Sequence, residues 1–258
     1  MTIDFHSATN RGTYTTRHAD ANWKQAMLGL VDPCGTVVAD IGCGGGIYTR
    51  AWRDLGAASV TGVDFSVQML EDARETSEDY PALSFVRGDA ADTELPGSSF
   101  DIVFSRAVIH HLPSVGPAFA EAYRILKPGG TVIVQDRTIE DVRQPASPEH
   151  LRGYFFELFP RLLELEQARR PESADITTRL TDAGFTGVIA LPLFEQRRTY
   201  ANGDELAADL RARTGRSILH ELTDDELELL ITSIEDRAAG SFPLTEADRW
   251  TVWTARKP

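Results

Sequence analysis

Short apolar segments recur at a regular spacing along the first half of the chain. They are rich in β-branched residues, are bounded by Gly, Asp, Arg or Pro, and span residues 36–42, 58–64, 83–89, 100–106 and 131–136. Such runs are typical of strands that are buried on both faces of a parallel sheet. Helical patterns lie between most of them, over residues 47–56, 66–76 and 113–126. The alternation predicts an α/β protein with a doubly wound sheet.

The pattern changes after residue 136. Residues 145–171 are dense in aromatic residues and leucine and are interrupted by Pro160, which predicts two short helices lying over the sheet. We expect the remaining elements to be a helix over 174–183, a sixth strand over 187–200, amphipathic helices over 204–214 and 224–238, and a last strand over 249–256.

We find no internal repeat and no low-complexity linker, so we expect residues 1–258 to form a single domain. Its expected parts are an N-terminal helical cap (1–35), a ligand-binding core (36–136), a lid insertion (137–173) and the completion of the sheet (174–258), which contains a helical insertion at 203–240.

Composition and charge narrow the function. A hydrophobic content of 42% with 25% charged residues is that of a folded globular protein. The formal net charge of −13 argues against binding to nucleic acid, because such proteins neutralise phosphates with clustered Lys and Arg. No apolar run approaches the roughly 20 residues of a membrane span, and because the first residues are polar we expect no signal peptide. Two cysteines, Cys34 and Cys43, are too few for a disulfide framework or a structural zinc site, so we expect a cytoplasmic protein without a metal.

The first expected strand leads into a glycine-rich turn that opens a helix. Glycines at 42, 44 and 46 allow positive φ and leave room for a ligand against the backbone. The dinucleotide fingerprint needs a further glycine where this chain has Ile47. Asp40, just before the turn, would repel a pyrophosphate and attract a ligand that carries an ammonium and a sulfonium group. The turn therefore favours S-adenosylmethionine over a nicotinamide dinucleotide.

Two further acids follow the next strands. Asp64 ends the second strand, 24 residues after Asp40, where its oxygens can accept both hydroxyls of a ribose. Asp89 ends the third strand, where it can accept from an adenine amino group while Ala90 donates its backbone N–H. Because the carboxyl ends of parallel strands meet at one edge of a sheet, we expect the three acids to form one site at the topological switch point. The alternative for each acid alone is a turn former or a helix cap.

Five motifs occur in a fixed order: DIGCGGG (40–46), GVDFS (62–66), GDA (88–90), FDIVFSRAVIHHL (100–112) and YRILKPGG (123–130). Together they resemble the class I S-adenosylmethionine-dependent methyltransferases, in particular the group that includes quinone-biosynthesis C-methyltransferases and many small-molecule enzymes. The resemblance covers roughly residues 36–136. It implies a Rossmann-like, seven-stranded, mostly parallel sheet in the order 3-2-1-4-5-7-6, with helical lid insertions.

The resemblance also implies contacts with the cofactor. The residues that would line the methionine part are Asp40, Gly42, Cys43, Gly44 and Arg106. The residues that would hold the adenosine are Asp64 on the ribose, Phe65 and Met69 beside the adenine, and Asp89 and Ala90 at its edge.

The acceptor is best narrowed by exclusion. Methylation of amino groups on nucleic-acid bases typically uses an Asp/Asn-Pro-Pro-aromatic motif after the fourth strand, where this chain has residues 105–108, Ser-Arg-Ala-Val. Cytosine-C5 chemistry needs a cysteine nucleophile, and neither Cys34 nor Cys43 is placed for it. Arsenic methylation needs several thiols, and this chain has only two cysteines. We therefore expect a small-molecule acceptor, and the chain to act as a monomer or a homodimer.

His110 and His111 are the candidate general bases. They follow the fourth strand, close to where the methyl group should point, and histidine titrates near neutral pH. The alternative is that one histidine caps or packs against the following helix while the other only lines the pocket.

Two segments are expected to cover the site. Tyr154, Phe155 and Phe159, with Glu157 as a polar contact, would form the acceptor pocket and exclude water; the alternative is that the aromatic residues are ordinary core. In the N-terminal segment, Tyr14 and Arg17 would belong to a lid in which Arg17 pairs with the cofactor carboxylate, or else to a solvated arm.

The sequence thus predicts transfer of a methyl group from S-adenosylmethionine to a small molecule. A non-catalytic S-adenosylmethionine-binding or regulatory protein and a nicotinamide-dependent dehydrogenase remain as alternatives, because doubly wound sheets host many chemistries.

Overall fold

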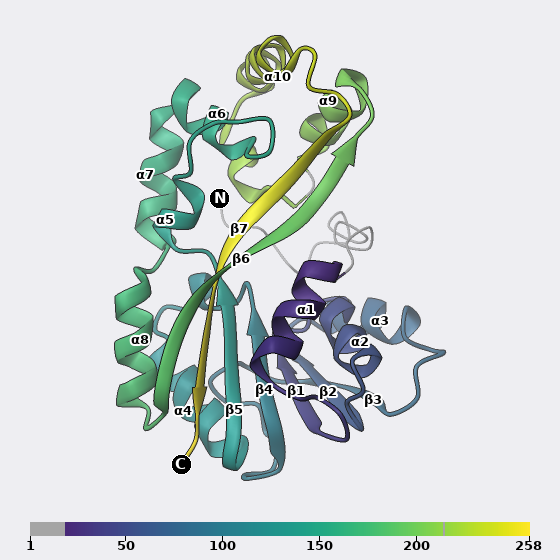
Figure 1. The fold of residues 1–258 in the computed structure, drawn as a ribbon, viewed down its shortest axis with the longest axis vertical. Coiled ribbons are helices and arrows are strands. Elements are labelled where there is room, and N and C mark those ends of the chain that lie inside the picture. The colour runs from purple at the N-terminus through teal and green to yellow at the C-terminus, as the bar shows by residue number, and fades with distance from the viewer. Residues whose placement is uncertain (1–18, 214) are drawn as a thin grey trace.

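The computed structural model describes residues 19–213 and 215–258. Its central feature is a seven-stranded sheet in the order β3-β2-β1-β4-β5-β7-β6 (Figure 1). The strands are β1 Val37–Ile41, β2 Ser59–Asp64, β3 Leu83–Arg87, β4 Phe100–Arg106, β5 Leu126–Asp136, β6 Thr186–Tyr200 and β7 Leu244–Arg256. The first five strands are parallel, and β7 runs antiparallel to both of its neighbours. The predicted fold class and strand order are confirmed.

Helices cover both faces of the sheet, because consecutive side chains of each strand point to opposite faces. On one face, Val38 packs in a cluster with residues of α1 (Ala21–Leu30) and α2 (Ile47–Asp54). On the other face, the adjacent Ala39 packs in a cluster with residues of α4 (Gly116–Ile125) and α8 (Ser173–Asp182). Helix α3 (Val67–Glu75) connects β2 to β3 and begins at Ser66, whose side chain accepts from the Met69 N–H as the N-cap.

A second group of helices forms a lid with an apolar core of its own. It comprises α5 Ile139–Val142, α6 Arg152–Leu158, α7 Pro160–Arg169, α9 Gly203–Arg211, α10 Asp224–Ala238 and the short 3₁₀ helix Ser217–Glu221. Their buried apolar side chains form one cluster, separate from the two clusters on the sheet. In Figure 1 these helices lie beyond the carboxyl ends of β4 and β5, joined to the sheet by the long ribbon of β6 and β7.

The last strand is longer than the sequence pattern predicts. It begins at Leu244 rather than at residue 249, because Leu244 to Asp248 pair with β6 between Tyr200 and Glu195. Three of those added residues are polar: Thr245, Glu246 and Asp248. They interrupt the apolar pattern from which a strand is predicted. The short helix α5 was also not predicted, although Thr138 and Asp141 form a capping box at its start.

Among the described residues, no helix combines the length and the apolar character that crossing a membrane requires.

Candidate functional site

The glycine-rich turn after β1 has a closed side and an open side. Gly42 donates its N–H to Val63 O of β2 at 2.7 Å and has φ +73°; a Cβ there would lie 2.2 Å from Val108 Cγ2. At Gly44 and Gly45, in contrast, a Cβ would meet nothing within 4 Å. The turn is therefore held against β2 and the segment after β4, while its tip is free to contact a ligand.

Asp40 lies behind this turn at the end of β1. Its side chain is buried, with the residue only 2% exposed, and its Oδ2 accepts a hydrogen bond from Thr49 Oγ1 at 2.6 Å. Burial raises the pKa of Asp40 to about 7, although Thr49 and the charge of Arg106 act in the opposite direction. A carboxylate in this position is stabilised by a cation, which makes the site suited to a positively charged ligand.

Asp64, at the end of β2, connects the loops around it. Oδ2 accepts from Gly44 N and Oδ1 accepts from Ser66 N, both at 2.9 Å. Burial raises the pKa of Asp64, and those backbone donors oppose the effect. The backbone of Phe65 also bonds this carboxylate, and the lone-pair capacity that remains is what the hydroxyls of a ribose could use. Phe65 beside it is 47% exposed, and Met69 is buried.

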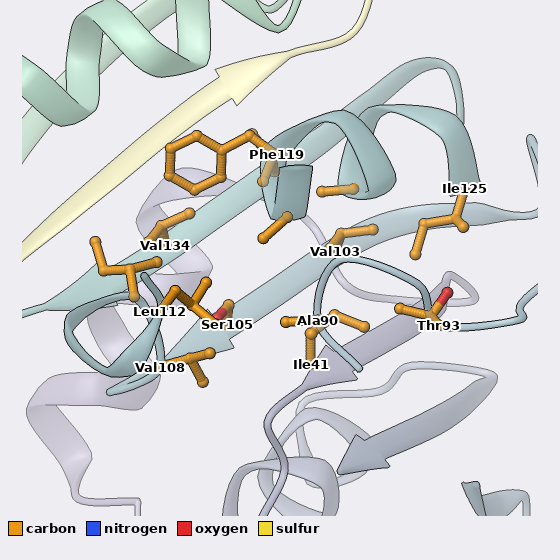
Figure 2. Close-up of a pocket in the computed structure, with 14 residues that line it drawn as sticks. Ile41, Ala90, Thr93, Val103, Ser105, Val108, Leu112, Phe119, Ile125 and Val134 are labelled. Carbon is orange, nitrogen blue, oxygen red and sulfur yellow. The ribbon is translucent and has the colours of Figure 1, made fainter. Parts of the chain in front are cut away.

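The remaining residues predicted for the cofactor lie in different environments. Asp89 is exposed and accepts from Ala91 N at 2.8 Å. Ala90 lines an apolar pocket between β4 and α4, together with residues such as Val108 (Figure 2). Cys43 is buried, and its burial raises the pKa of the thiol well above the usual range, so a thiolate is disfavoured there.

Arg106 is engaged by a partner that the sequence analysis missed. At the end of β4, its Nη2 donates to Glu195 Oε2 of β6 at 2.5 Å, and its guanidinium lies between the rings of Tyr48 and Trp250, 4.5 and 4.0 Å from their centroids. Glu195 raises the pKa of Arg106 despite the opposing effect of burial. The contact of Arg106 with the methionine part of the cofactor stays a prediction. No local motif marks Glu195, because the pair joins residues 89 positions apart.

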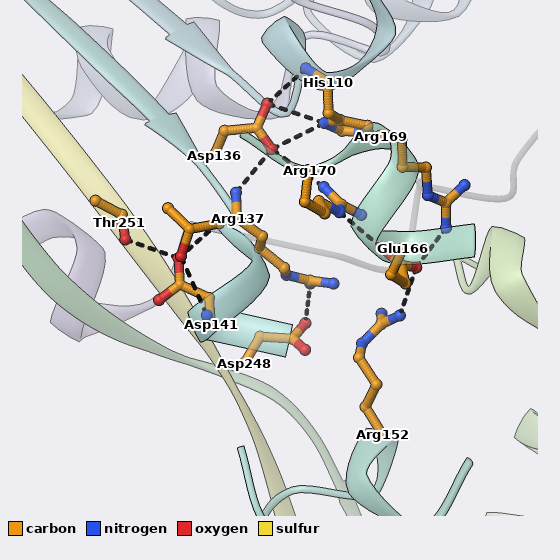
Figure 3. A network of polar contacts seen from close by, with 11 residues as sticks. His110, Asp136, Arg137, Asp141, Arg152, Glu166, Arg169, Arg170, Asp248 and Thr251 are labelled. Carbon is orange, nitrogen blue, oxygen red and sulfur yellow. Dashed lines mark hydrogen bonds and ion pairs between the residues drawn. The ribbon is translucent and has the colours of Figure 1, made fainter. Parts of the chain in front are cut away.

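His110 forms a pair with Asp136, the last residue of β5 (Figure 3). The imidazole Nδ1 lies 2.8 and 2.9 Å from the two carboxylate oxygens of Asp136. Burial lowers the pKa of His110, and Asp136 opposes this shift. The pKa of Asp136 lies at about 2, because His110 and Arg170 outweigh the effect of burial. A carboxylate that holds one nitrogen of a neutral imidazole leaves Nε2 as the proton acceptor.

His111 is exposed, and its ring lies 3.9 Å from that of His110, centroid to centroid. Of the two candidate bases, the structure therefore places His110 beside an orienting carboxylate. A sequence signal for Asp136 existed, since β4 and β5 are parallel neighbours and their carboxyl ends lie together.

The residues predicted for the acceptor pocket lie in the lid. Tyr154, Phe155 and Phe159 are buried in the lid cluster with residues of α9 and α10. Glu157 is on the surface, where its Oε2 accepts from Arg237 Nη1 at 2.6 Å. None of these four lines the pocket of Figure 2, so their role at the acceptor stays a prediction. Tyr14 and Arg17 lie outside the described residues.

Comparison with known proteins gives a consistent classification. Residues 39–134 match the family model described as a methyltransferase domain. The chain is 30% identical to a malonyl-[acyl-carrier protein] O-methyltransferase of Yersinia pestis over 162 residues, which are 61% of this chain and 58% of that protein. It is 33% identical to a demethylmenaquinone methyltransferase of Tropheryma whipplei over 149 residues, 57% of this chain and 59% of that protein. The matches thus span less than two thirds of these relatives.

Solved structures share the fold. A putative methyltransferase from an antibiotic biosynthesis pathway of Anabaena variabilis gives a TM-score of 0.70 at 23% identity, covering 91% of this chain and 97% of that one. Phosphoethanolamine N-methyltransferase 2 of Haemonchus contortus, in complex with S-adenosyl-L-methionine, gives 0.62 at 22% identity, covering 99% and 60%.

The resemblance inferred from the sequence is confirmed: this chain carries a methyltransferase domain of the class I, S-adenosylmethionine-dependent type. The cofactor inferred from the acidic residues and glycines is the one that this class of domain uses.

We expect Gly42→Ala to destabilise the protein and Gly45→Ala to be tolerated. The first substitution puts a methyl group into Val108 and forces a side chain to a positive φ, which costs about 1–3 kcal/mol. The second adds a methyl group in open space. Urea unfolding of the cofactor-free variants measures both, and equal stabilities would show that the close approach at Gly42 is not tight.

The raised pKa of Asp40 predicts a pH-dependent stability. The folded state binds the proton of Asp40 up to about pH 7, whereas the unfolded chain releases it near 3.8, so this contribution is lost as pH rises between these values. From pH 4 to pH 8, wild type should therefore lose at least about 1 kcal/mol of its free energy of unfolding relative to Asp40→Asn. Unfolding of the cofactor-free proteins tests this, with the exposed Asp182→Asn as control. Identical pH profiles for wild type and Asp40→Asn would contradict the assignment.

Proposed function

We propose that this protein transfers the methyl group of S-adenosylmethionine to a small-molecule acceptor and releases S-adenosylhomocysteine. The observation that carries the proposal is Asp40, a buried carboxyl next to an open glycine turn, whose one side-chain hydrogen-bond partner among the described residues is Thr49. A cationic ligand supplies the charge that this carboxylate needs, whereas a pyrophosphate would add repulsion.

The chain offers a group for each part of such a ligand. The open tip at Gly44 and Gly45 can approach the methionine part, and the carboxylate of Asp64 can accept from the ribose hydroxyls. Phe65 presents an exposed aromatic face to a base, and Asp89 and Ala90 follow on the next strand end. S-adenosylmethionine supplies an activated methyl group when it is bound; the residues of the chain bind, align and exclude water.

His110 is our candidate for the group that removes a proton from the acceptor. Its Nδ1 is held by Asp136, and its pKa lies below the ordinary value of 6.5, so the neutral imidazole dominates at pH 7. The proton of a hydroxyl, amine or activated carbon would pass to Nε2, and Asp136 would stabilise the resulting imidazolium. The lid above the carboxyl ends of β4 and β5 would exclude water.

Further features of the proposal come from the sequence. We propose a single domain with a core and a lid, acting in the cytoplasm as a monomer or homodimer, with no nucleic-acid partner. The two relatives named above act, by their names, on a carrier-bound malonyl group and on a quinone, so they support small acceptors without selecting one.

Asp64→Ala should weaken the binding of S-adenosylhomocysteine by about 1–3 kcal/mol, because it leaves two ribose hydroxyls without an acceptor. Asp101→Ala is the control, since Asp101 of β4 bonds Lys127 and the Val37 N–H instead. Isothermal titration calorimetry measures both affinities. An unchanged affinity in Asp64→Ala would remove the ribose assignment, and binding of NADH in place of S-adenosylhomocysteine would overturn the proposed function.

His110→Ala should lower the rate of methyl transfer by about 10²-fold or more. The assay follows radiolabelled methyl groups from S-adenosylmethionine into a metabolite extract of the host. The affinity for S-adenosylhomocysteine should hardly change, and the exposed His220→Ala should match wild type. Equal losses of rate and of affinity would assign His110 a structural role, and a rate loss confined to His111→Ala would transfer the base to His111.

A further inference from the structure

A layer of arginines, two of them buried and two partly buried, separates the carboxyl end of β5 from the lid. It consists of Arg137, which follows β5, Arg152 of α6, and Arg169 and Arg170 at the end of α7 (Figure 3). We call these four residues the arginine layer. Burying so many cations is unexpected in a chain with a net charge of −13.

Too few acids face the arginine layer. Glu166 is shared by three of its members: it accepts from Arg170 at 2.7 Å, from Arg169, and from Arg152 at 3.4 Å. Asp136 accepts from Arg170 at 3.2 Å and also holds His110. Asp248 accepts from Arg137 at 2.5 Å and lies 3.9 Å from Arg197 as well. Arg197 also pairs with Glu246, at 3.3 Å. Within the arginine layer, three carboxylates thus serve four arginines, and one of the three also holds His110.

Arg137 and Arg152 are the two members of the arginine layer that are buried as whole residues. Arg137 is 6% exposed, stacks on Trp250 at 4.2 Å, and its Nε is buried with no hydrogen-bond partner among the described residues. Arg152 is 7% exposed, and within the described part of the chain the one hydrogen bond of its side chain is the 3.4 Å contact with Glu166. Unpaired guanidinium donors are costly to bury, because each loses its bonds to water.

The positive charges of Arg137 and Arg152 repel each other. The pKa of Arg152 falls to about 9, first through burial and then through the charge of Arg137. Burial also lowers the pKa of Arg137, which Asp248 partly offsets. His150 lies under the same influence: burial and then Arg152 lower its pKa, and its Nε2 is buried without a hydrogen-bond partner in the described ranges.

We propose that Arg137 and Arg152 bind an anionic group of the methyl acceptor, a carboxylate or a phosphate, with His150 beside them. The proposal rests on the function proposed above and names the class of acceptor. An oxyanion would provide the missing acceptors for both guanidiniums and relieve their repulsion. Arg170 bonds both Asp136, which holds His110, and Glu166, so the arginine layer and the candidate base belong to one polar network (Figure 3).

The test measures anion binding to the full chain saturated with S-adenosylhomocysteine. Inorganic phosphate and acetate are titrated by calorimetry at constant ionic strength, into wild type, Arg152→Gln and Arg161→Gln. Arg161 is the matched control, since it lies on α7 but is half exposed and pairs with Glu226. We expect wild type to bind an anion and Arg152→Gln to bind it about tenfold or more weakly, as expected for loss of a charge-assisted contact. Arg161→Gln should bind as wild type.

Each outcome has a definite meaning. Preference for acetate assigns a carboxylate, and preference for phosphate assigns a phosphate monoester; both support the proposal. No anion binding in wild type, or the same loss in Arg161→Gln, overturns it. Anion binding that S-adenosylhomocysteine abolishes also overturns it, because the arginine layer then holds the carboxylate of the cofactor.

Two further measurements keep the test decisive. If Arg152→Gln does not fold, His150→Gln replaces it, with the expectation of weaker anion binding at unchanged affinity for S-adenosylhomocysteine. The affinity of wild type for S-adenosylhomocysteine is measured separately. If S-adenosylhomocysteine does not bind, the proposed function is contradicted. The anion titration, in contrast, tests only the role of the arginine layer.

Discussion

The site is organised around a carboxylate that has been removed from water. Within the described part of the chain, the side chain of Asp40 accepts one hydrogen bond, from Thr49, and burial raises the pKa of Asp40 to about 7. A buried anion of this kind is unfavourable unless a cation approaches it. The glycine turn makes that approach possible, because Gly42 packs against Val108 on one side while Gly44 and Gly45 leave the other side open. On the proposed function, the selectivity for a sulfonium ligand and the location of its binding site would follow from the same few residues.

The second constraint is the connection between sheet and lid. Strands β6 and β7 pair from Thr186 and Arg256 at one end to Tyr200 and Leu244 at the other, so one continuous ribbon belongs to both parts. Along it, Glu195 holds Arg106, and Asp248 holds Arg137. The acids of the ribbon therefore fix the orientation of arginines that emerge from β4 and β5. The same ribbon sets the height of the lid above the carboxyl ends of the strands.

How much the sequence predicted depends on the distance over which each interaction acts. The sheet order is what the resemblance to a known family implies, whereas the glycine turn and the positions of Asp40 and Asp64 follow from local patterns and from the geometry of parallel strands. The pairing of Arg106 with Glu195 does not, because the antiparallel ribbon brings together residues far apart in the chain. The apolar character of Phe155 predicted burial, but periodicity does not say which surface a helix packs against, and the partners are α9 and α10 of the lid.

The most direct test of the account is whether S-adenosylmethionine displaces a proton from Asp40 when it binds. Calorimetric titrations at pH 7 in two buffers with different heats of ionisation give the number of protons exchanged. A carboxyl with a pKa of about 7 should release about half a proton per molecule of S-adenosylmethionine bound. In Asp40→Asn this half proton should be missing. Binding without proton release in wild type, or the same release in Asp40→Asn, would contradict the claim that a buried carboxylate selects the cationic ligand.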